Sequence, residues 1–172
     1  MRFCMKFGDT NFIGVVNPTE YKSFVNEDWE LGMLLQHFSN EMKLGNILVF
    51  QMTDEGIEHS WDIEVKFESN LIEQDCFRKA VGYIKVNDNK LYLVDYDCLT
   101  MSAQFEDEKI PDKNCSNYRI DIENGIYRVD FIQFYDVDKD KYTGMNEKDI
   151  LLNFTKVLEF QQTVDKVLWC GF

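Results

Sequence analysis

Hydrophobic and polar positions alternate most clearly over residues 61–67, where apolar side chains occupy every second position. Because successive side chains of a strand point to opposite faces, this alternation predicts a strand with one buried face. Residues 47–52 are apolar except for Gln51, which predicts a strand buried on both faces. The two patterns together indicate a sheet packed against a hydrophobic core.

A helical repeat covers residues 27–44. Apolar side chains recur there at the spacing of one helix face, at Leu31, Leu34, Leu35, Phe38 and Met42. Asn26 is the expected N-cap, and Gly45 is expected to end the helix. The first turn would carry three carboxylates, which the helix dipole favours at that end: Glu27, Asp28 and Glu30.

Turn residues between apolar runs predict two β-hairpins. The first joins 81–86 to 91–94 across residues 87–90, and the second joins 118–122 to 126–134 over Asn124 and Gly125. Asn-Gly is the strongest short hairpin signal because both residues tolerate a positive φ. Residues 99–117 lack strand alternation, so they are expected to form a long ordered loop with one helical turn.

Residues 149–155 fit a strand and a helix equally well by spacing. We favour a strand, because the two predicted hairpins build a sheet that could receive it. The chain is therefore expected to form a single domain over residues 1–172. The predicted class is α+β and β-rich, with antiparallel, β-sandwich-like sheets and one amphipathic helix near the N-terminus.

The chain is strongly acidic, with 31 acidic and 18 basic residues and a formal net charge of -13. Nucleic acids and anionic membranes carry the same sign, so neither is expected as a partner, whereas a basic protein is. The five cysteines are odd in number and form no CxxC pair, which indicates reduced thiols in a cytoplasmic protein. We expect them to be small buried hydrophobic residues, since neither they nor the two histidines show zinc-ligand spacing.

Three stretches carry a resemblance to known proteins: residues 25–31 (VNEDWEL), 99–107 (LTMSAQFED) and 124–129 (NGIYRV). In these stretches the chain resembles small acidic β-sandwich proteins of bacteria, a group that includes toxin-immunity proteins and the competence-associated nuclease inhibitor of bacilli. The resemblance implies a protein that inhibits or sequesters another protein. It implies no catalytic residues.

A cluster of acids on either side of residue 99 indicates where such a partner would bind. If the loop after residue 99 folds back on the preceding strand end, carboxylates and two aromatic rings share one surface: Asp95, Tyr96, Asp97, Phe105, Glu106, Asp107 and Glu108. Acidic rims steer encounters with basic partners, and aromatic side chains anchor the centre of an interface. The alternative is that these acids only keep a Phe-rich protein soluble.

Residues 136–147 resemble a calcium-binding loop. Acids occupy loop positions 1, 3, 5 and 12, at Asp136, Asp138, Asp140 and Glu147, where an EF-hand places its oxygen ligands. Lys141 stands where the sharp turn requires Gly, and a strand rather than a helix is expected before the loop. The alternative is a solvated acidic loop, and no other cofactor is expected.

The chain contains no glycine-rich phosphate loop, no GxSxG and no HExxH motif, so an enzyme is not expected. The leading hypothesis is an acidic bacterial protein that occludes a basic toxin or nuclease in the manner of an immunity protein. A ligand- or calcium-binding β-sandwich module is the alternative, and a hydrolase with paired carboxylates comes third. The sequence leaves the oligomeric state open.

Overall fold

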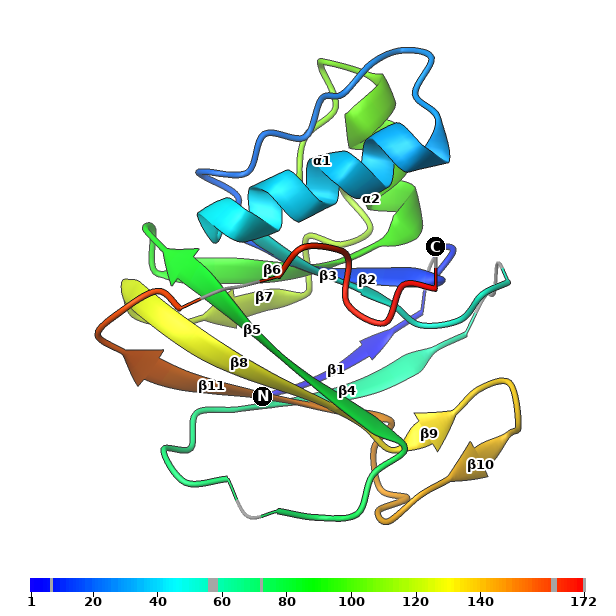
Figure 1. Cartoon of the computed structure of the whole chain (residues 1–172), viewed down its shortest axis with the longest axis vertical. Coiled ribbons are helices and arrows are strands. Elements are labelled where there is room, and N and C mark those ends of the chain that lie inside the picture. Colours follow the sequence, from blue (N-terminus) through cyan, green and yellow to red (C-terminus); the bar gives the residue numbers. More distant parts are fainter. Residues whose placement is uncertain (7, 56–58, 72, 162–163, 172) are drawn as a thin grey trace.

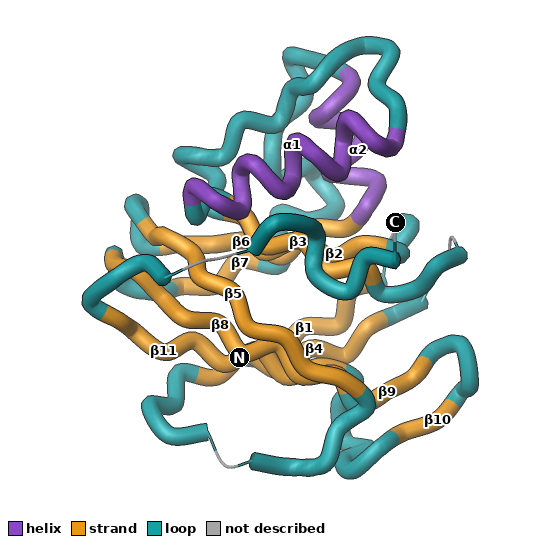
Figure 2. Tube along the Cα trace, in the orientation of Figure 1, coloured by secondary structure: helices purple, strands orange, loops and turns teal. Residues whose placement is uncertain are grey.

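Three layers build the molecule: a five-stranded sheet, a four-stranded sheet packed on it, and two helices over the second sheet (Figure 1, Figure 2). The structure is a computed structural model that describes residues 1–6, 8–55, 59–71, 73–161 and 164–171. The predicted class, α+β and β-rich with antiparallel sheets, is confirmed.

The five-stranded sheet has the order β1-β4-β11-β8-β5. Its strands are β1 (Arg2–Met5), β4 (Trp61–Lys66), β11 (Ile150–Val157), β8 (Gly125–Gln133) and β5 (Arg78–Val86). Neighbours are antiparallel except β4 and β11, which are parallel. The strand predicted near residues 149–155 is therefore confirmed as β11. It lies at the centre of the sheet, where its first five residues are buried.

The four-stranded sheet has the order β3-β2-β6-β7 and is antiparallel throughout. Its strands are β3 (Ile47–Gln51), β2 (Phe12–Val16), β6 (Lys90–Asp95) and β7 (Arg119–Asp121). Every residue of β2 and β3 is buried, because helices cover one face and the five-stranded sheet covers the other. A small ribbon of β9 (Tyr135–Asp136) and β10 (Lys141–Tyr142) extends from the end of β8.

Both hairpin predictions were wrong. β5 pairs with β8, whereas β6 pairs with β2 and β7, so each predicted hairpin joins two strands of different sheets. The turns after β5 and β7 are corners at which the chain passes from one sheet to the other. The alternation of a strand reports which face is buried, and it does not report whether the next strand pairs with it or packs over it.

The first helix, α1 (Leu31–Leu44), begins four residues later than predicted. Its N-cap position is Glu30, which makes no side-chain capping bond, and no acid lies in its first turn. The side chain of Asn26 instead accepts from the backbone N–H of Asp28 in the preceding loop. The predicted end is confirmed, because Gly45 has a φ of 81° and its N–H bonds to the last turn.

The second helix, α2 (Tyr96–Gln104), begins three residues before the loop predicted over 99–117 and takes the first six residues of that loop. It follows β6 directly, and Asp95 caps it by accepting from the N–H of Cys98 at 2.9 Å. Only one of its buried residues is large, and the others are small: Leu99, with Cys98, Ser102 and Ala103. A face of this composition shows no clear helical repeat of large apolar residues, which is why the helix was missed.

One aromatic stack joins the two sheets. The rings of Phe50 on β3 and Phe131 on β8 are 3.8 Å apart between centroids. Arg78 of β5 closes the same region, since its Nη2 donates to the carbonyl oxygens of Gln51 and Met52 and its guanidinium lies 4.1 Å from the Trp169 ring. Burial lowers the pKa of Arg78 to about 10, which leaves it charged. It therefore ties the C-terminal segment to both sheets.

Candidate protein-binding surface

The structure divides the predicted partner-binding residues between the interior and two ends of α2. Asp95 is 2% exposed, and its carboxylate is used to cap the helix. Burial, with Asp112 and Asp97 nearby, raises the pKa of Asp95 to about 6. Asp95 therefore caps α2 from the interior of the protein, and its carboxylate is not exposed to a partner.

Tyr96 and Asp97 lie at the N-terminal end of α2. The Tyr96 ring stacks on Phe12 with centroids 5.2 Å apart and is half-buried. Asp97 is exposed, and its carboxylate accepts from the N–H of Asp9 at 3.0 Å. The Tyr96 ring therefore packs the start of α2 against the first residue of β2, and the Asp97 carboxylate holds the loop before β2 by its hydrogen bond.

Phe105 and the three acids after it lie beyond the other end of α2. A helix of nine residues is about 13 Å long, so this group is well separated from Asp97. Phe105 is 42% exposed, and Glu106, Asp107 and Glu108 are all exposed. The helix dipole disfavours carboxylates at this end, and no basic residue lies in the last turn. These acids therefore do not stabilise the helix that they follow.

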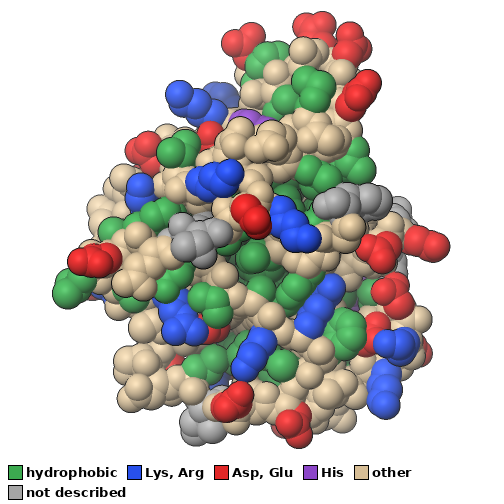
Figure 3. Space-filling model, in the orientation of Figure 1, with side chains coloured by type: hydrophobic (Ala, Val, Ile, Leu, Met, Phe, Trp, Pro, Cys, Tyr) green, Lys and Arg blue, Asp and Glu red, His purple; other side chains and the backbone are tan. Residues whose placement is uncertain are grey.

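A second loop lies against the same end of α2. The backbone N–H groups of Val25 and Asn26 both donate to the carbonyl oxygen of Ala103, at 2.9 and 3.2 Å. Three further exposed carboxylates come with this loop: Glu27, Asp28 and Glu30. We call residues 24–31 and 105–109 together the acidic apex. Figure 3 shows acidic side chains with hydrophobic ones between them over this end of the molecule.

The acidic apex concentrates carboxylates that have no ion-pair partner. The apex holds six acids and one lysine, and among the described residues none of these acids forms an ion pair. Ten acids outside the apex do form ion pairs, among them Asp62 with Arg2, Asp130 with Arg128 and Glu123 with Lys156. The apex also exposes the apolar rings of Phe24 and Phe105, at 41% and 42%. Unpaired charge and exposed aromatic rings therefore coincide there.

Sequence reasoning found one half of the acidic apex and missed the other. The helical repeat predicts residues 27–30 in the first turn of a helix, where the helix dipole would make their charges stabilising. Their place in a loop follows from the later start of α1. The signal in the sequence was the run from Glu27 to Glu30, which contains three acids beside Trp29 and follows the hydrophobic residue Phe24.

The acids of the predicted calcium loop are held by other groups. Asp136 lies 3.0 Å from the Lys139 ammonium, Asp138 accepts from the Thr53 hydroxyl, and Asp140 accepts from the Tyr135 hydroxyl. Glu147 is exposed, beyond the β9–β10 ribbon. Among the described residues these four acids do not form a cluster of three with ligand atoms in mutual reach. Calcium binding stays a prediction, and calorimetry with millimolar calcium tests it.

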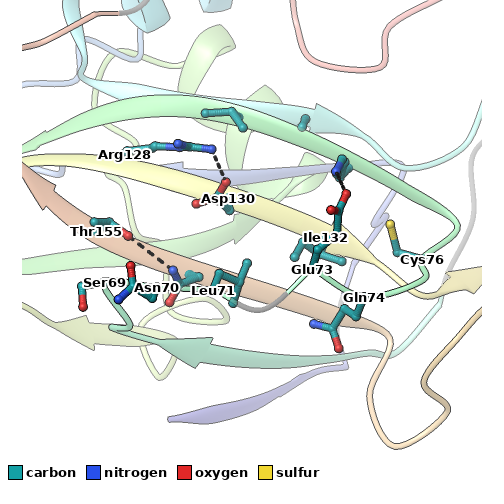
Figure 4. Close-up of a pocket in the computed structure, with 14 residues that line it drawn as sticks. Ser69, Asn70, Leu71, Glu73, Gln74, Cys76, Arg128, Asp130, Ile132 and Thr155 are labelled. Carbon is teal, nitrogen blue, oxygen red and sulfur yellow. Dashed lines mark hydrogen bonds and ion pairs between the residues drawn. The ribbon is translucent and has the colours of Figure 1, made fainter.

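A groove of about 380 Å³ lies on the outer face of the five-stranded sheet, beside residues 69–71 and 73–76 (Figure 4). Its charged side chains neutralise one another, with Arg128 paired to Asp130 at 2.8 Å and Lys79 paired to Glu73 at 3.3 Å. Burial raises the pKa of the Cys76 thiol, so this cysteine is not an activated nucleophile. The groove therefore offers mixed polar contacts and no charge left over for a ligand.

Comparisons with known proteins place the fold but no family. No protein-family model matches the chain, and no curated protein matches its sequence. A solved structure named Crocagin biosynthetic gene J aligns with 92% of this chain and 96% of its own, at 8% identity and a TM-score of 0.58. The chain shares the fold of that protein.

ComJ from Bacillus subtilis, an inhibitor of the DNA degrading activity of NucA, is a second solved structure that matches. It covers 91% of this chain and 99% of its own, at 12% identity and a TM-score of 0.46. A protein described as a nuclease inhibitor is thus among the solved structures that match. Neither α1 nor α2 is long and apolar enough to cross a membrane, and the described residues form no other helix.

Proposed function

We propose that this chain is a binding protein whose acidic apex docks on a basic surface of another protein and covers it. One observation carries the proposal: six exposed carboxylates lie on two loops with a single lysine among them, and among the described residues none of the six forms an ion pair. Like charges gathered on a surface repel one another, so the arrangement costs folding stability. A basic partner would remove that cost by supplying the missing lysines and arginines.

The acidic apex has the parts that such an interface needs. Unpaired carboxylates attract a basic partner over about one Debye length, which is ~8 Å at physiological salt. Phe24 and Phe105 supply apolar rings of the kind that anchor interface centres. Docking would therefore combine electrostatic steering with burial of the two rings, and the partner would be blocked by occlusion.

The finer proposal concerns the partner and the setting. A basic toxin or nuclease has the charge that the acidic apex would bind, and the chain would then act as an immunity-type inhibitor in the bacterial cytoplasm. The resemblance found in the sequence supports this class of partner. The structural neighbours share the fold alone, so the proposal depends on the charge and shape of the apex.

The experiment that tests the proposal is a pull-down with the tagged chain from its host lysate, at low and at high salt. The expected result is one stoichiometric basic protein that is lost at high salt. Charge reversal of Glu106, Asp107 and Glu108 together should abolish capture without changing the melting curve. A second variant that reverses Glu27, Asp28 and Glu30 should do the same, which tests the half of the apex found only in the structure.

The matched control reverses three exposed acids outside the apex, at Glu55, Glu147 and Glu159. It changes the net charge by the same amount, so it separates a local surface from overall acidity. Capture that survives both apex variants would overturn the proposed surface. Capture of an acidic or neutral protein that high salt does not release would overturn the electrostatic mechanism.

A further inference from the structure

Two thiols and a carboxylate from separate segments meet beneath the acidic apex. Cys98 lies in the first turn of α2, and Asp112 and Cys115 lie in the connection from α2 to β7. The two sulfur atoms and one carboxylate oxygen all lie within 4.8 Å of one another. Both cysteines are buried, and Asp112 is half-buried.

The backbone holds each of these side chains in place. Asp112 Oδ1 accepts from the N–H groups of Asn114 and Cys115, at 3.0 and 2.8 Å, which fixes the turn between Asp112 and Cys115. Two residues separate these potential ligands, a spacing common in pairs of zinc ligands. Asp95 accepts from the N–H of Cys98, which fixes the third position. Hydrogen bonds to the backbone therefore position the potential ligands on both segments in the absence of an ion.

The dimensions suit a small thiophilic cation. Ligand atoms of a tetrahedral zinc site with sulfur at ~2.3 Å and oxygen at ~2.0 Å lie roughly 3.5–3.8 Å apart. Contraction from 4.8 Å requires side-chain shifts of about 1 Å or less.

An entry path is present beside the cluster. A cleft of about 530 Å³ is lined by Cys98 and Asp112, together with the charged side chains of Asp107, Glu108, Lys109 and Lys113. A water molecule in this cleft would reach Cys98 and Asp112. Three anionic protein ligands and a divalent ion would leave one negative charge at the site.

We propose that Cys98, Asp112 and Cys115 bind Zn²⁺ or a similar thiophilic divalent cation, with water as the fourth ligand. On binding, each thiol releases its proton to solvent and forms a metal–sulfur bond, the Asp112 carboxylate forms a metal–oxygen bond, and the hexaaqua ion loses five waters and keeps one. Residues 105–109 lie between Cys98 and Cys115, so the ion would close a loop that carries half of the acidic apex. The proposal goes beyond the proposed function and does not depend on it.

The experiment uses the purified chain, free of oxygen and kept reduced with a phosphine, with Co²⁺ as the probe. Wild type should bind one equivalent with a thiolate-to-cobalt charge-transfer band and the intense visible bands of tetrahedral cobalt, and Zn²⁺ should displace it. One equivalent of Zn²⁺ should raise the melting temperature. Cys98→Ser and Cys115→Ser should each weaken the charge-transfer band, and the double variant should lose it.

Two variants serve as controls. Cys170→Ser changes a buried cysteine outside the cluster and should bind cobalt as wild type does. Asp112→Asn keeps an oxygen that can accept the same two backbone bonds, so it should fold normally and bind Zn²⁺ at least tenfold more weakly. Circular dichroism in the presence of a chelator checks that each variant is folded.

One further readout needs no variant, which keeps the proposal testable if the serine variants do not fold. Zn²⁺ should slow the alkylation of Cys98 and Cys115 in wild type and leave that of the exposed Cys4 unchanged, as peptide mass spectrometry would show. A cobalt spectrum without a thiolate band, a band that persists in the double serine variant, or alkylation rates that Zn²⁺ does not alter would each overturn the site.

Discussion

Asn89 and Asn124 bind each other across the two corners of the molecule. The N–H of Asn89 donates to Oδ1 of Asn124 at 2.7 Å, and the N–H of Asn124 donates to Oδ1 of Asn89 at 3.2 Å. Asn89 lies in the corner between β5 and β6, and Asn124 lies in the corner between β7 and β8. The residues predicted to form two separate hairpin turns therefore bond to each other. We call these two reciprocal hydrogen bonds the asparagine clasp, and it fixes both crossings between the sheets.

The asparagine clasp should be measurable as a coupling free energy. Asn124→Ala and Asn89→Gly each remove one side-chain acceptor, and Gly keeps the positive φ of 51° that Asn89 adopts. Each variant should lose about 0.5–1.5 kcal/mol of unfolding free energy, because the lost bonds are solvent-exposed. Urea denaturation should show that the double variant loses less than the sum. Fully additive losses would mean that the two bonds act independently.

Asp149 should make the unfolding free energy fall in acid. It is buried, which by itself would raise its pKa, but the His59 ring nitrogen 3.5 Å away and hydrogen bonds from the Asp62 N–H and the Tyr142 hydroxyl lower the pKa below its usual value. Since the fold favours the charged form, the stabilisation is complete above the unfolded pKa of ~3.9 and is lost as the pH falls through the folded pKa.

The Asp149→Asn variant isolates that contribution. At neutral pH it should be less stable than wild type by about 1–3 kcal/mol, because a donor replaces one acceptor of a buried group. The difference should shrink as the pH falls below ~3.9 toward the lowered folded pKa, where wild type itself becomes protonated. Urea titrations across this range give the measurement. A gap that stays constant with pH would show that the ionised carboxylate contributes nothing.

Gly45 should be intolerant of a side chain. It has a φ of 81°, and a Cβ there would lie 2.6 Å from the ring of Phe160. Gly45→Ala should cost about 1–3 kcal/mol, from the left-handed backbone and the displaced ring. Gly32, inside α1, has no atom within 4 Å of an added Cβ, so Gly32→Ala should stabilise by about 0.5–1 kcal/mol. Thermal denaturation of both variants should show melting shifts of opposite sign.

The exposed rings of the acidic apex should matter for binding and little for folding. Phe24→Ala and Phe105→Ala should each raise the dissociation constant for the captured partner about tenfold, the effect expected for an interface anchor. Phe67 is 47% exposed outside the apex, so Phe67→Ala should leave affinity unchanged. Affinity measured by calorimetry, with melting curves of each variant, separates the two effects. If all three variants bound the partner as tightly as wild type, the two rings would not be interface anchors.

Local patterns predicted the parts of the fold that local burial decides. The alternation over residues 61–67 became β4, the apolar run at 47–52 became β3, and Gly45 ended α1 as expected. In each case the side chains themselves carry the information, because a buried face requires apolar residues at its own period. The helix start and α2 were missed where that period is weak, around residue 27 and over Tyr96–Gln104.

The sequence by itself determined the excess of acid and the strands and helix with strong periods. Only the tertiary structure decided which strands pair, which acids gather and which cysteines meet. Val25 and Asn26 bond to the carbonyl of Ala103 near the end of α2, just before residues 105–109, and the connection after α2 folds back to bring Cys115 beside Cys98. The physical reason is that burial leaves a mark at each position, whereas contact between distant segments depends on the packing of the whole chain and leaves no local pattern.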